Sequence, residues 1–412
     1  MSLRNWAGNL EFRAARIHRP ESVEQVQGGV AAADRVRPLG TRHSFNDIAD
    51  SDADLLSTEH LNQVIEFSGD SVWVEGGIRY GDLAEYLASQ ARTLANFASL
   101  PHISVAGSVA TGTHGSGVAN PSLSAAVREV QIVKADGSLT KLYRGEDRGF
   151  DGAVVALGAL GVVTSLRLDV VPMFEVAQTV YEGLPWKSLA SEVEALLSGA
   201  YSVSLFTFWN SDLIDQVWVK RTSGESRSEY FGAEAAVGPR HPLPNMPWEN
   251  CTEQMGIYGP APARLPHFEM EFTPSGGEEL QAEYILPREH AFAALMEIDA
   301  LRDRIAPLLY VSEIRTVAAD DLWLSPSFGR DCLCIHFTWK QRQTEVEALL
   351  PEIEARLAQF GARPHWGKLF DMKADRIQAL YPRFGDFQEL VRSYDPAGKF
   401  RNEFLESRLF GV

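Results

Sequence analysis

The segment from His102 to Gly117 constrains this chain more than any other part of the sequence. It reads HISVAGSVATGTHGSG and mixes glycine with serine, threonine and small apolar residues. A second segment of similar character, Pro38 to Phe45, precedes it. Such loops let backbone N–H groups converge on an anion without side chains in the way, and their hydroxyls add donors. We therefore expect the loops to hold a diphosphate, and the alternative is a pair of tight turns.

Neither loop fits the two common nucleotide-binding patterns. No Lys-Ser or Lys-Thr pair follows the glycine spacing of a Walker motif, and the Gly-x-Gly-x-x-Gly of a Rossmann turn is missing from both. A P-loop enzyme and a nicotinamide dehydrogenase are therefore disfavoured.

Length, charge and cysteine usage restrict the organisation and partners of the chain. With 412 residues it exceeds the size at which one hydrophobic core keeps growing, so two domains are expected. The net charge of −17 repels phosphate backbones and anionic lipid heads, which disfavours nucleic acid and membrane partners. Three cysteines cannot form a disulfide framework. The first residues lack the apolar core of a signal peptide. The longest apolar run, Ala153 to Val163, is too short to cross a bilayer. We expect a cytoplasmic monomer.

The first 170 or so residues alternate short strand patterns with glycine-rich corners, which is typical of an α+β fold. Tyr80 to Ala91 places apolar residues at helical spacing and predicts one amphipathic helix. Glu129 to Tyr143 alternates around an Asp-Gly pair, which predicts a hairpin. Val162 to Val171 is apolar at close intervals and predicts a buried strand.

The sequence pattern changes near residue 175, where a second domain is expected to begin. Two helical patterns, Glu289 to Ala306 and Gln343 to Phe360, accompany two strand patterns, Leu309 to Thr316 and Cys332 to Trp339. This order predicts a sheet with helices on one face.

Two pairs of polar residues share a face of these predicted strands. Glu313 and Arg315 are two positions apart, as are His336 and Thr338, so each pair can line one cavity. The opposite face would carry the core residues Ile314, Leu333, Ile335 and Phe337. The alternative for Glu313 and Arg315 is a solvated ion pair at the surface.

Cys332, Cys334 and His336 share that same face and raise the question of a metal site. Neighbouring i, i+2 positions on a straight strand lie about 6 to 7 Å apart, which is too far for one zinc ion without a bulge. We therefore expect no metal.

Six motifs, taken in order, resemble one family. Together they closely resemble the bacterial alditol (xylitol) oxidases, a branch of the vanillyl-alcohol-oxidase flavoproteins that also contains the aldonolactone oxidases. The resemblance covers nearly the whole chain. Because the six motifs follow the order found in the family, it is specific. The motifs are Arg42-His-Ser-Phe45, Ala98 to Gly117, Gly158 to Val163, Glu313-Ile-Arg-Thr-Val317, His336-Phe-Thr-Trp339 and His365-Trp-Gly-Lys368.

The resemblance implies an α+β fold with an FAD-binding domain of the PCMH type. That domain would comprise residues 1–172 and be completed by residues 374–412. Residues 173–373 would form a cap domain with a mixed or antiparallel sheet covered by helices.

The resemblance also implies an FAD covalently bonded through its 8α-methyl group to His43. Many relatives have glycine or serine ahead of this histidine, whereas this chain has Thr41 and Arg42, which crowd the loop and add a cation. The remaining cofactor residues implied are Gly40, Ser44, Ser104, Gly107, Ser108, Thr111, Gly112, Thr113, His114, Gly161 and Val162.

Oxidation of an alcohol by flavin moves a hydride from carbon while the hydroxyl proton leaves, so the site must stabilise an incipient alkoxide. The resemblance places Arg315 and Lys368 at the reacting hydroxyl. Arg315 would act as a fixed donor, and Lys368, desolvated beside another cation, would accept or relay the proton. Glu313 would accept a hydrogen bond from a neighbouring hydroxyl, and Ser99, His336 and Thr338 would bind further hydroxyls.

A carboxylate beside two cations suits a neutral polyhydroxyl compound better than an acid. We therefore expect an oxidase that converts a terminal hydroxyl of a small polyol, such as xylitol or sorbitol, to the aldose and reduces oxygen to hydrogen peroxide. An aldonolactone oxidase or a short-chain alcohol oxidase of the same family is the alternative. A non-catalytic nucleotide-binding module is a more distant one.

Overall fold

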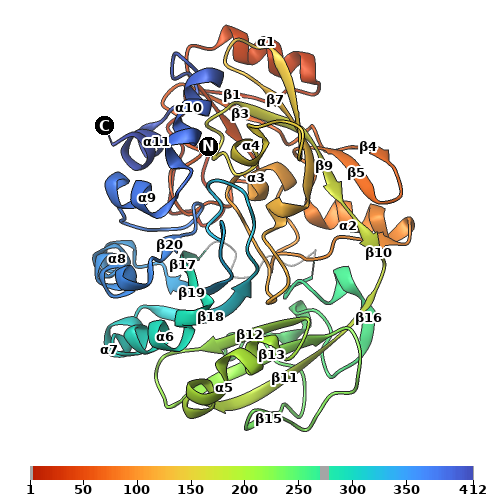
Figure 1. Cartoon of the computed structure of the whole chain (residues 1–412), viewed down its shortest axis with the longest axis vertical. Coiled ribbons are helices and arrows are strands. Elements are labelled where there is room, and N and C mark those ends of the chain that lie inside the picture. The colour runs from red at the N-terminus through yellow and green to blue at the C-terminus, as the bar shows by residue number, and fades with distance from the viewer. Residues whose placement is uncertain (1–2, 270–277, 412) are drawn as a thin grey trace.

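The computed structural model describes residues 3–269 and 278–411 and contains 28% helix and 29% strand. The N-terminal half builds two main sheets (Figure 1). A parallel sheet has the order β1 (Arg16–His18), β3 (Asp54–Ser57), β2 (Val36–Leu39). An antiparallel sheet has the order β4 (Val64–Phe67), β5 (Ser71–Glu75), β9 (Val162–Asp169), β7 (Val127–Val133), β8 (Leu139–Tyr143).

Helices α1 (Val23–Ala32), α2 (Tyr80–Ser89), α3 (Val105–Ala110) and α4 (Phe150–Val154) connect these strands. The predicted helix at 80–91 and the predicted hairpin are both confirmed. In the hairpin turn the Asp136 carboxylate accepts hydrogen bonds from the backbone N–H and hydroxyl of Ser138, and Gly137 supplies a positive φ of 81°. The Asp-Gly pair forms the turn because a residue with little steric restriction is needed at that φ.

The second half is organised around one large antiparallel sheet, shown in the lower part of Figure 1. Its strand order does not follow the chain, because β18 and β19 pair with β12 and β17 on either side. The order is β14 (Glu229–Tyr230), β15 (Ala233–Ala235), β11 (Glu175–Pro185), β13 (Leu213–Arg221), β12 (Ser202–Thr207), β18 (Leu309–Val317), β19 (Cys332–Lys340), β17 (Glu279–Pro287) and β20 (Arg363–Pro364), with β16 (Tyr258–Pro260) paired to β11. A short β6 (Arg92–Thr93) pairs with β10 (Val171–Pro172).

One face of this sheet packs against α5 (Trp186–Ser198), α6 (Ala291–Asp299) and α8 (Gln343–Leu357), as predicted. The prediction of a single helix over 289–306 is wrong. A short 3-10 turn, Arg288–His290, precedes α6, and a separate α7 (Arg302–Ile305) follows it. The predicted inward-facing residues Ile314, Leu333, Ile335 and Phe337 are all fully buried in the main core.

The C-terminal helices α9 (Ala374–Leu380), α10 (Phe384–Tyr394) and α11 (Glu403–Leu405) return to the N-terminal half (Figure 1). The Asn402 side chain donates to the carbonyls of Asp47, Ile48 and Asp50, and Arg37 donates to that of Phe400. These bonds join chain segments about 350 positions apart in sequence. We therefore propose domain boundaries near 172 and 373.

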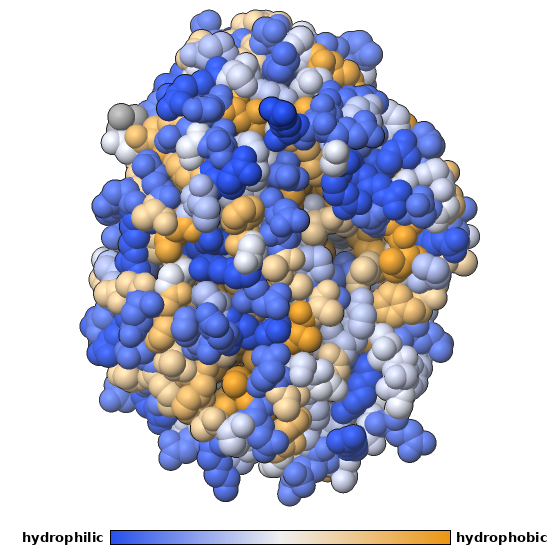
Figure 2. All heavy atoms as spheres, viewed as in Figure 1, coloured by the Kyte–Doolittle hydropathy of each residue, from blue (hydrophilic) through white to orange (hydrophobic). Residues whose placement is uncertain are grey.

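On the face shown in Figure 2, hydrophilic residues form most of the surface and hydrophobic ones gather in small separate groups. Among residues 3–269 and 278–411, no helix is both long and apolar enough to cross a bilayer.

Candidate active site

One cavity joins the two glycine-rich loops to the free face of the large sheet. Most of the residues predicted from sequence line it. The loop residues that do so are Gly40, Thr41, Arg42, His43, Ser44, Gly107, Ser108, Thr111, Thr113, His114 and Gly161, and those from the sheet and its surroundings are Ser99, Glu313, Arg315, His336, Thr338 and Lys368.

Three predicted cofactor residues lie outside this lining. The side chain of Val162 packs with Val26, Val30 and Val133 in a separate core cluster, because it alternates with Val163 along β9 and only Val163 lines the cavity. Gly112 has a positive φ of 67° and lies against Pro326, so it forms the turn that ends α3. Ser104 lies behind the lining, where its backbone N–H donates to the Thr41 hydroxyl.

The surroundings of Ser104 fit a phosphate group. A Cβ on Gly40 or on Gly107 would lie 2.6 Å or 2.8 Å from the Ser104 Oγ, so only glycine leaves space there. The Ser104 Oγ is buried and has no hydrogen-bond partner among the described residues. Gly40 and Gly107 do line the cavity and carry no side chain, so their backbones are accessible to an anion there. The two loops can therefore hold the diphosphate of a dinucleotide.

His43 lies at the junction between the loops and the sheet. Its ring is 4.4 Å from that of Trp6 and 5.1 Å from that of His102, measured between centroids. Burial, reinforced by His102 and Lys368, lowers the pKa of His43 to about 3. The imidazole is therefore neutral at physiological pH and retains a nucleophilic nitrogen.

The structure shows where the loop places Arg42, the extra cation noted in the sequence. Its φ is 62°, in the left-handed region that glycine adopts most readily. The side chain is exposed and its guanidinium donates to the carbonyl of Arg4, so the cation is held at the outer edge of the loop. The loop therefore accommodates Arg42 in a backbone conformation that glycine adopts with less strain.

A row of three titratable side chains crosses the large sheet. Residue pairing places His336 on β19 between Glu283 on β17 and Glu313 on β18. All three are buried and line the cavity. Glu283 was not predicted from the sequence.

Glu283 binds both predicted catalytic cations. Its Oε1 accepts from Nη2 of Arg315 at 2.8 Å, and its Oε2 accepts from Nζ of Lys368 at 2.6 Å. Burial alone would raise the pKa of Glu283, but the two cations outweigh it and hold that pKa well below the ordinary value. Burial lowers the pKa of Lys368, and Glu283 opposes this shift. The site therefore contains a buried ion triad of one carboxylate and two cations, and the charge of Lys368 acts on His43.

Glu313 has a different set of partners. Its Oε1 lies 2.7 Å from Nε2 of His267, and its Oε2 lies 3.6 Å from Nε of Arg315. Burial would raise the pKa of Glu313, but Arg315 and His267 lower it well below the usual range. Glu313 is thus a buried, ionised hydrogen-bond acceptor, which rules out the alternative of a solvated surface pair. His267 was also missed from the sequence.

His336 and Ser99 provide unused hydrogen-bonding capacity. Neither ring nitrogen of His336 has a partner in the part of the chain that the structure describes. Burial, reinforced by Lys368, holds the pKa of His336 well below its ordinary value, so the ring is neutral and offers one donor and one acceptor. Ser99 accepts a long hydrogen bond of 3.4 Å from Arg315. A hydroxylated ligand would satisfy these groups.

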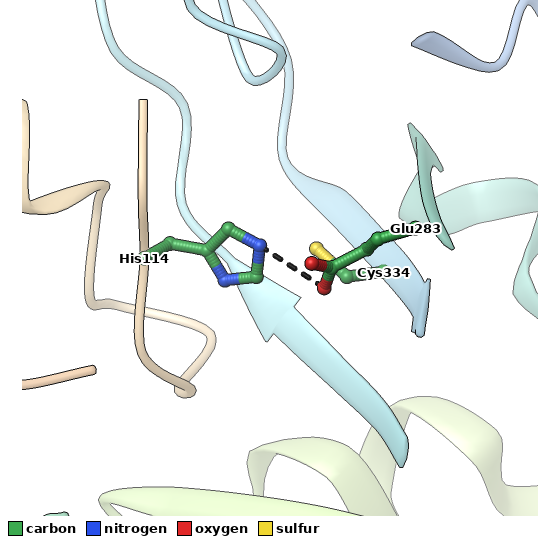
Figure 3. Close-up of side chains that lie close together, drawn as sticks. All are labelled: His114, Glu283 and Cys334. Carbon is green, nitrogen blue, oxygen red and sulfur yellow. Dashed lines mark ion pairs between the residues drawn. The ribbon is translucent and has the colours of Figure 1, made fainter. Parts of the chain in front are cut away.

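The donor atoms of His114, Glu283 and Cys334 lie within 4.8 Å of one another (Figure 3). The His114 Nε2 lies 3.2 Å from Glu283, whose two oxygens already bind Arg315 and Lys368. Burial raises the pKa of the Cys334 thiol well above normal, which keeps it protonated. Two adjacent cations and a protonated thiol disfavour a metal ion here.

Comparison with known proteins agrees with this geometry. The chain matches the FAD-binding domain family over residues 14–143 and the D-arabinono-1,4-lactone oxidase family over residues 278–408. It is 48% identical to an alditol oxidase from a Streptomyces species, with 99% of both chains covered. L-gulono-1,4-lactone dehydrogenase of Mycobacterium tuberculosis is 29% identical, with 97% of each chain covered. Cholesterol oxidase from B. sterolicum shares the fold, with a TM-score of 0.80 at 14% identity over 99% of this chain and 96% of that one.

The two family matches, together with the alditol oxidase match over nearly the whole chain, define an FAD-dependent oxidoreductase of the vanillyl-alcohol-oxidase class. The near-complete alignment shows that, within this class, the chain belongs to the alditol oxidase family. The resemblance carried by the six sequence motifs and the predicted α+β fold are therefore confirmed.

Proposed function

We propose that this protein oxidises a terminal hydroxyl of a small polyol to the aldehyde while oxygen is reduced to hydrogen peroxide. The observation that carries the proposal is the buried, ionised Glu313 beside Arg315, in the cavity that also contains His43. When bound, FAD supplies the hydride acceptor and passes the electrons to oxygen. The identity with an alditol oxidase supports the same substrate class.

The cavity residues divide into two groups. Lys368 and Arg315 bind the reacting hydroxyl and stabilise its negative charge as the proton leaves. Lys368 can accept that proton only as the neutral amine, a form that burial favours and Glu283 opposes. Glu313 accepts a hydrogen bond from the neighbouring hydroxyl, and His336, Thr338 and Ser99 bind the rest of the polyol. Glu283 holds the two cations in place between turnovers.

The cofactor is proposed to be bonded to His43 through the flavin 8α-methyl group. The neutral imidazole and its place between the diphosphate loops and Lys368 support this linkage. Gly40 and Gly107, which line the cavity, would hold the diphosphate through their backbones, and Ser104, packed against both glycines, would keep the two loops together.

Acid precipitation is expected to leave the yellow colour in the protein pellet of the unmodified protein. His43→Ala is expected to release the colour into the supernatant, because the covalent bond is lost. His60→Ala, at an exposed histidine, serves as the matched control and should retain the colour. Colour in the supernatant of the unmodified protein would contradict the covalent linkage.

The specificity constant for xylitol or sorbitol is expected to exceed that for 1-butanol by at least roughly tenfold, or about 1.4 kcal/mol. Without the second hydroxyl, the Glu313 carboxylate loses a partner, at a cost of about 1 to 3 kcal/mol. Glu313→Gln should shrink the ratio, because an amide also donates. An unchanged ratio in Glu313→Gln would show that Glu313 does not recognise the polyol.

Aldonolactone oxidation is the second candidate function. It is favoured by the match of residues 278–408 to the D-arabinono-1,4-lactone oxidase family. A panel of polyols and aldonolactones, assayed by peroxide formation, separates the two candidates.

All three cysteines are free and buried, which suits a reducing compartment. We therefore propose a cytoplasmic location. We also propose that the enzyme is a monomer whose partners are the polyol and oxygen.

A further inference from the structure

Lys220 is a buried cation that the proposed reaction does not use. It lies on β13 and is 1% exposed. Its Nζ donates to the carbonyl of Leu265 at 2.5 Å and to that of Pro266 at 3.1 Å, and it lies 3.2 Å from Nδ1 of His267. Within residues 3–269 and 278–411, Lys220 forms no ion pair with a carboxylate. Buried lysines without such a pair are rare, so this arrangement requires an explanation.

The hydrogen bonds of Lys220 determine which nitrogen of His267 carries the proton. An ammonium group has three donors and no acceptor, and the two carbonyls take two of these donors. The third donor points to Nδ1 of His267, which must accept. The ring proton of neutral His267 therefore lies on Nε2, which donates to the Glu313 Oε1 at 2.7 Å.

We propose that Lys220 and His267 are positioning residues that fix the orientation of Glu313 for polyol recognition. The inference rests on the proposed function of Glu313. Lys220 acts through His267, and neither residue needs to contact the reacting carbon. With Oε1 held by His267, the Oε2 of Glu313 lies toward Arg315 and is the oxygen left to accept from a substrate hydroxyl.

The charges around Lys220 give the arrangement a pH dependence. The titratable and charged groups that act on it are His267, Glu313, Cys251 and Arg315. Burial lowers the pKa of Lys220 to about 7, and burial followed by Lys220 lowers that of His267 to about 4. Between about pH 4 and pH 7, Lys220 is therefore charged and His267 is neutral with its proton on Nε2. As the pH rises through about 7, Lys220 loses its proton and no longer requires Nδ1 to accept.

A double-mutant cycle tests the positioning role. We expect Lys220→Met to reduce the ratio of the specificity constants for xylitol and 1-butanol by roughly tenfold, the loss of one charge-assisted hydrogen bond. In the Glu313→Gln background, Lys220→Met should change the ratio by less than about twofold, because the two residues act as one unit. An equal reduction in both backgrounds would overturn the proposal.

His267 offers a conservative rescue. The Nε2 of glutamine can replace the Nε2 donor of the imidazole, so His267→Gln should retain more of the xylitol preference than His267→Leu. Equal losses in these two variants would overturn the hydrogen-bond role of His267.

Nitrogen NMR of histidine-labelled protein provides a measurement that does not depend on activity or on the folding of the Lys220 variant. The His267 signals are assigned by their loss in His267→Gln. At pH 6, we expect His267 to be neutral with its proton on Nε2, and a proton on Nδ1 would overturn the proposal. If the unmodified protein oxidises no polyol, the proposed function fails, while the NMR result still tests the predicted tautomer of His267 on its own.

Discussion

Glu283→Gln is expected to lower the free energy of unfolding by about 3 to 5 kcal/mol at neutral pH, the usual cost of removing one partner from a buried ion pair. The carboxylate lies between Arg315 and Lys368, and its side chain is fully buried. Without its charge, Lys368 loses its buried ion-pair partner, and Arg315 keeps only the longer contact of 3.6 Å with Glu313. Urea denaturation of the holoenzyme measures the difference.

The destabilisation should depend on pH. Because the folded-state pKa of Glu283 is below the ordinary 4.5, its contribution is fully present above about pH 4.5 and is lost as the pH falls toward the folded-state value. The gap between the two proteins should therefore narrow in acid. Glu182→Gln, which removes a surface pair with Arg240, is the matched control and should cost about 0 to 1 kcal/mol. A loss in Glu283→Gln no larger than in this control would contradict the triad.

Lys368→Met is expected to lower kcat by roughly 10² to 10³ while FAD stays bound. The charge of Lys368 also lowers the pKa of His43, so Lys368 lies near the proposed flavin attachment. Its interaction with the reacting oxygen strengthens only as the proton leaves, so its loss should affect kcat more than KM. Arg315→Ala should behave in the same way.

Steady-state kinetics and the visible spectrum together check this prediction. Thr338→Val is the matched control. Thr338 lines the same cavity as Lys368 and lies two residues beyond His336 on β19. It should mainly raise KM, since we propose that Thr338 binds a distal hydroxyl. Normal turnover of every polyol by Lys368→Met would show that Lys368 does not act on the reacting hydroxyl.

The alternation of residues along the strands predicted several of the side chains that line the cavity. The alternation in Leu309–Val317 and Cys332–Lys340 correctly predicted which residues face the core and which face a cavity. The same alternation is present in Glu279–Pro287, with Glu279, Gln281 and Glu283 on one face. Polar residues at every second position usually indicate a solvated face, so this pattern alone does not predict that Glu283 lies in a cavity. Here that face lies inside the cavity.

The remaining features depend on contacts between distant parts of the chain. His267 lies in an irregular segment after Pro266, where no periodicity indicates its direction. It meets Lys220 and Glu313 only because β13, β12 and β18 are adjacent in the sheet, and sequence order does not reveal that arrangement. The split between α6 and α7 likewise has no glycine or proline to mark it. Tertiary packing, rather than local propensity, sets these features.

The most direct test of the central claim measures oxygen consumed, peroxide formed and aldose formed from xylitol by the same purified enzyme. We predict one peroxide and one aldose for each oxygen consumed, together with bleaching of the yellow flavin when xylitol is added without air. Oxidation of an aldonolactone with no turnover of any polyol would contradict the proposed function.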